Sequence, residues 1–236
     1  MLKHVSRMVL GPIARVLFRA TIVGRKNVPR SGPVILASNH LSFIDSVVIT
    51  LFARRPVSFL AKDSYFTGTG VKGFISRTFF RGIGAIPVSR GAGQAAQQAL
   101  DAGLGLLKDG EAFAIYPEGT RSRDGRLYRG KTGVAWLALT AGVPVVPVAL
   151  HGTNKVQPVG SSGITPAKVT IQFGKPLNLS KHGKADSGRA RRHATDEVMG
   201  AIAAMSGQER ADGYNEPPAK NFVEKVRRTF RSRAEL

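Results

Sequence analysis

The stretch NHLSFID, residues 39–45, places a histidine and an aspartate between two apolar runs. The run before it, 33–37, is typical of a buried strand, and the run after it, 47–53, is typical of a helix. His40 and Asp45 therefore belong to a strand-to-helix turn, where ligand sites of open α/β sheets lie. Five residues on one helix would separate the two side chains by about 140°. They can meet only if His40 lies in the loop and Asp45 in the first helical turn.

Two interpretations of this pair stay open at the level of the sequence. In the catalytic one, the Asp45 carboxylate accepts a hydrogen bond from one imidazole nitrogen of His40. This fixes the tautomer and leaves the other nitrogen as a general base. In the structural one, residues 42–45 form a capping box in its aspartate form, and Asp45 only complements a helix N-terminus.

The composition favours one globular domain that meets an anionic partner. With 236 residues, 42% of them hydrophobic, the chain can bury a single sizeable core with appendages. It has no cysteine, which excludes disulfides, thiolate catalysis and cysteine-ligated metals. The formal net charge of +20 indicates nucleic acid, a membrane surface or phosphorylated ligands as partners.

The N-terminal segment carries much of this charge and no acid before Asp45. Apolar residues at helical spacing in residues 2–20, interrupted by Gly11 and Pro12, predict a pair of short amphipathic helices. The pair would lie in a membrane interface or pack on the domain core, and the pattern leaves both open. The seven basic residues are Lys3, Arg7, Arg15, Arg19, Arg25, Lys26 and Arg30.

Strand and helix patterns alternate through the middle of the chain, which predicts an α/β domain with a mixed, largely parallel sheet flanked by helices. We expect membrane-associating helices at 1–20, the main domain at 21–206 and a basic tail at 207–236. No segment is expected to span a membrane or to be a signal peptide, so a cytoplasmic protein is the default expectation. The predicted strands are 21–24, 34–38, 57–61, 85–88, 112–116, 145–150 and 169–173; the predicted helices are 43–54, 71–80, 94–108, 134–141 and 187–205.

The C-terminal region changes character after residue 206. Residues 213–218 read as a linker, and the basic stretch 220–233 is either a second surface-binding helix or a disordered tail. The apolar run 143–148 reads as a strand whose prolines suit an entry and a bulge or edge, and we assign it a structural or channel-lining role.

Three further loops follow predicted strands and carry charged side chains. Arg90, just past strand 85–88, can clamp a phosphate with its planar fork. The loop around Glu118, Gly119 and Arg121 allows close backbone approach to a ligand, although a turn with a local ion pair is the alternative. Lys131 precedes a helix, and a helix N-terminus suits a phosphate.

Four sequence blocks, in order, resemble the signatures of the glycerolipid acyltransferases, especially the 1-acyl-glycerol-3-phosphate (lysophosphatidate) acyltransferases. Tyr116 stands where the family has phenylalanine, and Ser89 replaces its acid or amide, so no role is carried over to Ser89. The blocks are Asn-His-x-Ser-x-x-Asp at 39–45, Gly-x-Ile-x-Val-Asp/Asn-Arg at 84–90, Phe-Pro-Glu-Gly-Thr-Arg-Ser at 116–122 and Val-Pro-Val-x-Pro-Val at 143–148.

The resemblance implies transfer of a fatty acyl group from acyl-CoA or acyl-carrier protein to the sn-2 hydroxyl of lysophosphatidate, which makes phosphatidic acid. It implies no cofactor and no metal, and a peripheral place on the cytoplasmic face of the cell membrane, bound to its anionic surface. Glycerol-3-phosphate, another lysolipid or a glycolipid are alternative acceptors. A non-enzymatic basic protein that binds membranes or nucleic acid is the alternative of another class. Nucleic acid is disfavoured because aromatic stacking platforms are not interleaved with the basic residues.

Under this resemblance His40 is the general base and Asp45 orients it. Ser42 lies too close to the helix cap to be a nucleophile, so the acceptor hydroxyl attacks directly. We expect Arg90, Arg121 and Lys131 to hold the phosphate, and Glu118 to bond the glycerol hydroxyl or to order Arg121. The backbone N–H near Gly119 is the candidate donor to the oxyanion. The predicted substrate-binding set is Arg90, Glu118, Gly119, Thr120, Arg121 and Lys131.

Overall fold

The computed structural model describes residues 2–88, 95–161 and 163–216. Arg90 and the basic stretch 220–233 lie outside the described residues, so the predictions for them are not addressed by the structure.

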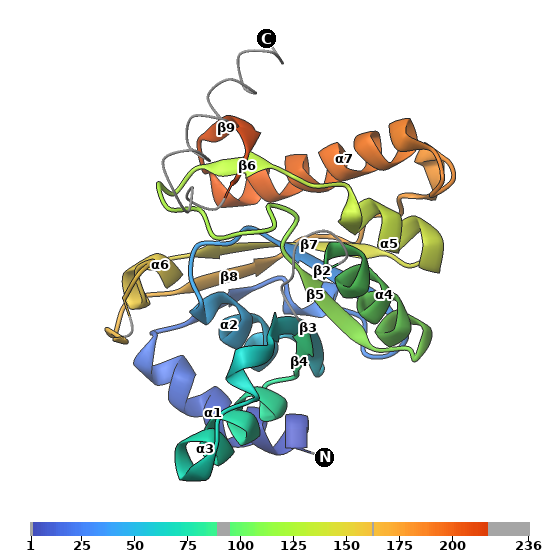
Figure 1. The fold of residues 1–236 in the computed structure, drawn as a ribbon. Helices are drawn as coiled ribbons and strands as arrows, with labels where there is room; N and C mark the ends of the chain where they lie inside the picture. The colour runs from blue at the N-terminus through green and yellow to red at the C-terminus, as the bar shows by residue number, and fades with distance from the viewer. Residues whose placement is uncertain (1, 89–94, 162, 217–236) are drawn as a thin grey trace, which may run out of the picture.

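A seven-stranded sheet forms the centre of the molecule, in the order β1-β8-β7-β2-β5-β3-β4 (Figure 1). β2, β3, β4, β5 and β7 run parallel to one another, β8 pairs antiparallel with β7, and β1 pairs parallel with β8. The prediction of a mixed, largely parallel sheet is confirmed. The strands are β1 (Thr21–Val23), β2 (Val34–Ser38), β3 (Val57–Lys62), β4 (Ala85–Val88), β5 (Ala112–Ile115), β7 (Val145–His151) and β8 (Thr170–Phe173).

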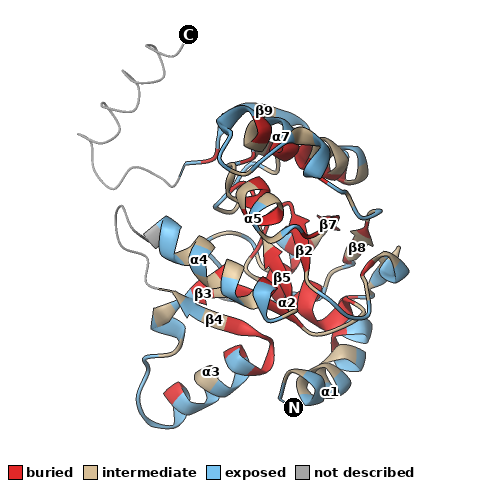
Figure 2. Cartoon of the chain, turned by 90° about the vertical axis from the view of Figure 1, so that its right-hand side faces the viewer, coloured by how far each residue is buried: buried red, intermediate tan, exposed pale blue. Residues whose placement is uncertain are grey.

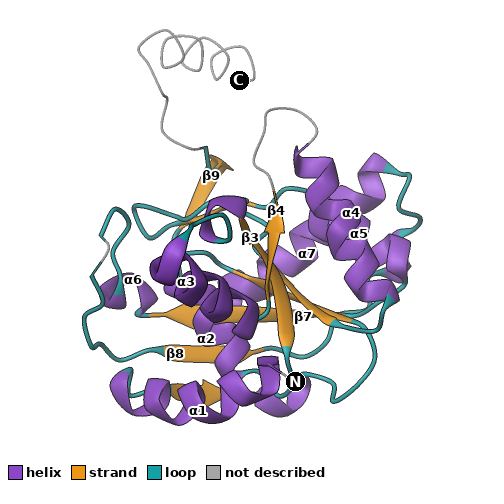
Figure 3. Ribbon diagram, turned by 60° about the horizontal axis from the view of Figure 1, so that its bottom comes forward, coloured by secondary structure: helices purple, strands orange, loops and turns teal. Residues whose placement is uncertain are grey.

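Helices cover both faces of this sheet (Figures 1 and 3). On one face lie α1 (Leu2–Leu17), α2 (Ile44–Phe52) and α3 (Gly70–Gly82). On the other lie α4 (Ala95–Lys108), α5 (Gly133–Ala141) and α7 (Gly188–Ser206). The short α6 (Thr153–Val156) follows β7, and 3₁₀ turns occur at η1 (Arg25–Asn27), η2 (Asp63–Tyr65) and η3 (Ser180–His182).

The sequence of β2 explains why helices are needed on both sides. All five of its residues are buried. Val34 and Leu36 belong to the apolar cluster beneath α1 and α2, whereas Ile35 and Ala37 belong to the cluster beneath α5 and α7. Alternate side chains of a strand point to opposite faces, so a continuous apolar run requires two cores.

The expected pair of N-terminal helices is wrong, because α1 is one helix with Pro12 inside it. Leu10, Ala14 and Phe18 pack on the core at four-residue intervals across the proline. The packing of this stripe on the core stabilises one continuous helix more than the proline destabilises it. Pro12 has no N–H, so the Met8 carbonyl loses its helical hydrogen bond, but Met8 is exposed.

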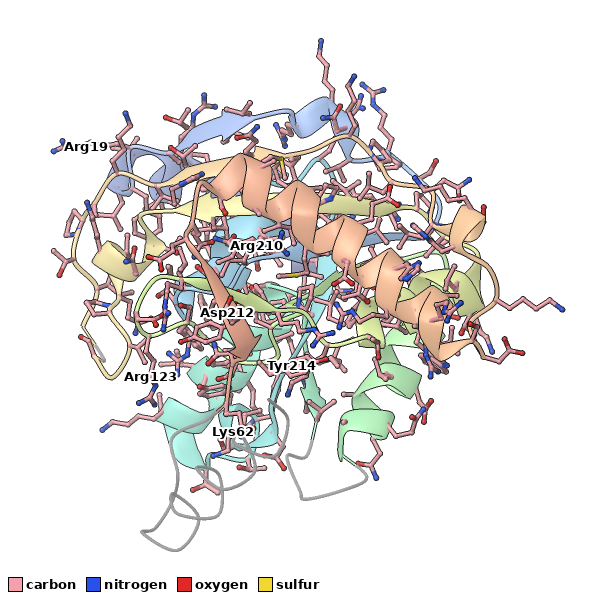
Figure 4. All side chains as sticks on the ribbon, turned by 90° about the horizontal axis from the view of Figure 1, so that it is seen from above. Arg19, Lys62, Arg123, Arg210, Asp212 and Tyr214 are labelled. Atoms are coloured by element: carbon pink, nitrogen blue, oxygen red, sulfur yellow. The ribbon has the colours of Figure 1, made fainter. Side chains whose placement is uncertain are left out.

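The interpretation of residues 213–218 as a linker is wrong for Gly213 and Tyr214. Both belong to β9 (Arg210–Tyr214), which pairs in parallel with β6 (Leu127–Arg129) in a separate two-stranded sheet. Figure 4 shows Arg210, Asp212 and Tyr214 in order along β9. Its Tyr214 ring packs against the Arg129 guanidinium of β6 at 5.2 Å.

Pro144 directly precedes β7, as expected for a proline at the entry of a strand. Pro147 lies within β7, which pairs in regular register with β2 on one side and β8 on the other, so the expectation of a bulge or an edge is wrong. The Pro147 carbonyl accepts from Gly174 just past the end of β8. The N and C=O of one strand residue point to the same side, so the nitrogen of Pro147 faces β8. Pro147 lies opposite Gly174, beyond the last residue of β8, so no hydrogen bond between the two strands needs its N–H. Across residues 2–88, 95–161 and 163–216, no helix is both long and apolar enough to cross a membrane.

Candidate active site

The candidate site forms where the carboxyl ends of β2 and β5 lie side by side. These strands are parallel neighbours. His40 follows β2, and Glu118 follows β5. The loop after β2 then enters α2 at Ile44, so Asp45 lies in the first turn of that helix, as the spacing predicted.

His40 and Asp45 are in contact. The distance from His40 Nδ1 to Asp45 Oδ2 is 2.8 Å, and the same oxygen accepts from the backbone N–H groups of Leu41 (2.6 Å) and Ser42 (2.8 Å). The Asp45 side chain is fully buried, and that of His40 is 17% exposed. Asp45 therefore orients the imidazole and binds the loop just before the helix. The N-cap of α2 is Phe43, and no side chain bonds at that cap, so the capping-box interpretation is wrong.

The Tyr116 ring stacks on one face of the His40 imidazole. The two rings stack with centroids 3.8 Å apart and planes 10° apart. The Tyr116 hydroxyl shares a hydrogen bond of 2.7 Å with Ser46 Oγ, and burial, followed by the nearby Asp45 charge, raises the pKa of Tyr116 well above its ordinary value. The phenol is therefore neutral at physiological pH. No group among the described residues hydrogen-bonds to His40 Nε2.

Glu118 holds the backbone of the loop that carries His40, residues 39–43. Its Oε1 accepts from the His40 N–H at 2.9 Å, and its Oε2 accepts from the Tyr128 N–H at 3.0 Å. The His40 carbonyl accepts from the Ser122 N–H at 2.7 Å. Burial raises the pKa of the Glu118 carboxyl to about 7, although the two N–H bonds oppose the shift.

This geometry changes the predicted role of Glu118. The structure shows no ion pair between Glu118 and Arg121 in the part of the chain that it describes, so the expected ordering of Arg121 by Glu118 is wrong. Contact of Glu118 with a glycerol hydroxyl stays a prediction. Both of its oxygens already accept backbone N–H groups, which makes it a support for the loop.

Gly119 permits a tight turn and a close approach. Its φ of +77° suits glycine, and its N–H donates to the Tyr116 carbonyl at 2.9 Å. The Gly119 N–H is therefore used by the turn, and a backbone N–H near Gly119 as the oxyanion donor stays a prediction. A Cβ at this position would lie 3.2 Å from Cδ, Cε and Nζ of Lys131, so the Lys131 side chain lies directly over Gly119.

The other predicted substrate-binding residues lie in the same loop. Arg121 is half-buried, and its guanidinium has no hydrogen-bond partner among the residues described. The Thr120 carbonyl accepts from Asn215 Nδ2 at 3.1 Å. The structure thus brings Lys131 and Arg121 to one loop, while Arg90 is outside the described residues.

Ser42 has a structural role. Its hydroxyl donates to the Gln157 carbonyl at 2.7 Å and accepts from the Ile44 N–H at 3.3 Å. Both contacts agree with the expectation that Ser42 is not a nucleophile.

Sequence reasoning missed a polar brace that joins residues 39–43 to the C-terminal region. Asn39 exchanges hydrogen bonds of 3.0 and 2.8 Å with the Leu150 backbone at the end of β7. Asn39 Nδ2 also donates to Gln208 Oε1 at 2.7 Å, and Gln208 Nε2 donates to the Gly125 carbonyl at 2.6 Å. Asn39 belongs to a recognisable motif, but a single glutamine far along the chain gives no local signal.

The chain is similar to proteins of known family. A family model described as Acyltransferase matches residues 19–151. A chloroplastic 1-acyl-sn-glycerol-3-phosphate acyltransferase of Brassica napus is 34% identical over 166 residues, covering 70% of this chain and 46% of that protein. One of Chlamydomonas reinhardtii is 32% identical over 199 residues, covering 81% and 58%. The chain therefore spans about half the length of the curated relatives that it matches.

A solved structure has the same fold. The crystal structure of the 1-acyl-sn-glycerophosphate acyltransferase PlsC from Thermotoga maritima superposes with a TM-score of 0.61 and 27% sequence identity. The match covers 83% of this chain and 76% of that one. The histidine–aspartate pair, the loops around it and the matched domain lead to one assignment: the chain belongs to the acyltransferase family.

Proposed function

We propose that this protein transfers a fatty acyl group from an acyl thioester, acyl-CoA or acyl-carrier protein, to the sn-2 hydroxyl of 1-acyl-glycerol-3-phosphate. The product is phosphatidic acid. The contact of His40 Nδ1 with Asp45 Oδ2 at 2.8 Å carries the proposal, because it leaves Nε2 to act as a base. The names of the relatives supply the acceptor and the reaction.

The reaction needs one proton carrier. His40 Nε2 takes the proton of the acceptor hydroxyl as its oxygen bonds to the thioester carbonyl carbon. The Asp45 carboxylate stabilises the imidazolium that forms. The tetrahedral intermediate then breaks its C–S bond, and the imidazolium returns the proton to the leaving thiolate. No covalent acyl-enzyme is required.

The residues around His40 favour this step by holding the imidazole in place. Its ring is fixed by Tyr116, its N–H by Glu118 and its carbonyl by Ser122. A base whose position is fixed before substrate arrives loses little freedom in the transition state.

Arg121 and Lys131 are the described cations that we assign to the acceptor phosphate, together with Arg90. Lys131 lies over Gly119, two residues from Arg121 in the loop that supports His40. Arginine binds phosphate through its planar fork, and lysine as a point charge.

We also propose that the protein acts as a peripheral protein on the cytoplasmic face of the cell membrane, where its lipid acceptor resides. α1 supports this by its exposed apolar side chains, of which Met8 is 78% and Val16 80% exposed. Arg15, which lies between them and is also exposed, would face anionic lipids.

Incubation of the purified protein with acyl-CoA or acyl-carrier protein and lysophosphatidate, followed by mass spectrometry, tests the proposal. We expect phosphatidic acid, and we expect His40→Ala to abolish nearly all of it. His182→Ala is a matched control, since His182 pairs with Glu197 at 2.5 Å on the opposite face of the sheet. Parallel assays with glycerol-3-phosphate, other lysolipids and glycolipids compare the acceptors. Absence of product with every acceptor would favour the non-enzymatic alternative, and wild-type turnover in His40→Ala would exclude the base assignment.

A further inference from the structure

A large basic hollow lies at the end of the sheet opposite the catalytic loops. Its open volume is about 1460 Å³, and its lining includes Pro56 and Glu111, which precede β3 and β5 at their amino ends. Eight lysines and arginines line it against one acid, Glu111. They come from α1, from η1 and the residues after it, from the segment between α2 and β3, and from α3. We call this feature the basic hollow.

The cations of the basic hollow lack compensating charge. Glu111 is already paired with Lys3 at 2.9 Å. The guanidinium groups of Arg7 and Arg25 both donate to the Ala53 carbonyl, so two like charges converge on one oxygen. Burial, followed by the charge of Arg25, lowers the pKa of Arg7 to about 10, and Arg7 Nε is buried without a partner among the described residues. A bound anion would relieve this repulsion.

Three other cations of the basic hollow are free to bind. Lys26, Arg30 and Arg81 are exposed, and none of their side chains has a hydrogen bond or ion pair within the described part of the chain. Like charges gathered on one surface repel one another, and an anionic partner would offset this repulsion.

Apolar surface on both neighbouring helices indicates where the anion comes from. Met8 of α1 lines the basic hollow and is 78% exposed. Val71, Phe74 and Ile75 do not line it; they lie in the first half of α3, whose other end reaches the hollow at Arg81, and they are 75, 62 and 61% exposed (Figure 2). The helices touch where α3 ends, because a Cβ at Gly82 would lie 2.5 Å from Ser6 Oγ. Exposed hydrocarbon beside a cationic recess matches the interface of a bilayer, where acyl chains meet phosphates.

We infer that the basic hollow binds phosphate headgroups of anionic lipids while the exposed faces of α1 and α3 dock beside it on the bilayer. The inference rests on the proposed membrane location and adds a headgroup site and a second docking helix to it. Because the hollow and the catalytic loops lie at opposite ends of the sheet, the headgroup site is separate from the acceptor site.

Charge reversal of the three unpaired cations tests the site. In the full chain, the triple variant Lys26→Glu, Arg30→Glu and Arg81→Glu should bind vesicles of phosphatidylglycerol and phosphatidylcholine roughly a hundredfold more weakly in co-sedimentation. The matched control Lys108→Glu, Lys184→Glu and Arg189→Glu lowers the net charge equally on the opposite face, and these residues are also exposed. It should stay within about threefold of wild type. Equal losses in the two triples would overturn the site in favour of net charge alone.

A second variant and a soluble anion distinguish a lipid from free phosphate. Phe74→Gln with Ile75→Gln should weaken vesicle binding at least several-fold without lowering the melting temperature, because both side chains are exposed. Wild-type vesicle binding in this double variant overturns α3 as a docking helix. Inorganic phosphate, titrated by calorimetry, should bind only weakly. The lipid assignment is overturned if the wild type binds inorganic phosphate tightly and the triple variant loses this phosphate binding but still binds vesicles.

Turnover in neutral detergent micelles separates this inference from the proposed function. In these micelles the hollow triple, the variant with Lys26→Glu, Arg30→Glu and Arg81→Glu, should make phosphatidic acid at the wild-type rate. A wild-type protein that makes no product contradicts the proposed function. If the hollow triple binds anionic vesicles as tightly as the wild type, the headgroup site is contradicted and the proposed function is not.

Discussion

The two ends of the central sheet hold their charged groups in opposite ways. At the carboxyl end, Asp45 and Glu118 are buried, and backbone N–H groups bind Oδ2 of Asp45 and both oxygens of Glu118. At the amino end, Lys26, Arg30 and Arg81 are exposed and without side-chain partners among the described residues. Buried charge is tolerated only with donors that fix it, and fixed groups suit chemistry. Exposed unpaired charge stays free to meet a partner and suits reversible docking.

The largest effect on turnover should come from a substitution of Asp45, which is buried at the carboxyl end of the sheet. In Asp45→Asn an amide oxygen in the place of Oδ2 can still accept from Leu41, Ser42 and His40 Nδ1, but the negative charge that stabilises the imidazolium is lost. We expect the turnover number to fall by roughly 10³–10⁴-fold, with little change in vesicle binding. Steady-state kinetics and co-sedimentation of the same preparation measure both.

Asp124→Asn is the control for that substitution. Asp124 lies in a neighbouring loop and accepts from Ser122, Arg126 and Tyr128, yet it is exposed. Its loss should change the turnover number by less than about tenfold. Similar losses at Asp45 and Asp124 would contradict a specific role for Asp45 in orienting His40.

A smaller effect, on stability, should follow from the buried carboxyl of Glu118. Its pKa is raised from 4.5 to about 7, so between these values the folded protein binds a proton that the unfolded chain has released. The contribution of Glu118 to stability therefore falls as pH rises through this window, by about 3 kcal/mol at most. Glu118→Gln stays neutral, so its stability deficit relative to wild type should shrink between pH 5 and pH 8. Urea unfolding of both proteins across this range measures the difference, and a constant difference would contradict the assignment.

The smallest effect should come from the brace at Gln208. Gln208→Ala removes the bonds to Asn39 and Gly125 but leaves Asn39 bonded to Leu150. We expect a loss of about 1 kcal/mol in the free energy of unfolding and a several-fold fall in turnover number with an unchanged KM. Gln208→Glu keeps the acceptor for Asn39 and should recover part of the turnover. An effect on KM alone would indicate that Gln208 contacts substrate instead of positioning the loop.

The main sheet could be predicted from the sequence because its strands are short apolar runs between turn signals. The 34–38 and 85–88 strands match β2 and β4 to the residue, and the others agree within one or two residues. The five predicted helices also form, as α2, α3, α4, α5 and α7, because each buries apolar residues against one of the two cores. The short α6, β6 and β9 were missed, because three to five residues carry too little periodicity.

The candidate site was predictable only in part. The 39–45 spacing predicted the His40–Asp45 contact, since both residues lie in one short turn. The role of Glu118 could not be predicted, because its partners His40 and Tyr128 lie on separate segments. Sequence spacing also could not show that the turn itself uses the Gly119 N–H, which leaves the other N–H groups near Gly119 as candidate oxyanion donors.

By itself, the sequence determined the alternation of strands and helices, the histidine–aspartate turn and the excess of basic residues near the N-terminus. These features depend on local spacing and composition, which the chain carries wherever it folds. Only the tertiary structure decided that α1 continues through Pro12, that Tyr116, Glu118 and Gln208 hold the catalytic loop, and that the cations gather at the end of the sheet opposite the site. Those outcomes depend on contacts between distant segments, whose free energy appears only when both segments are packed on the same core.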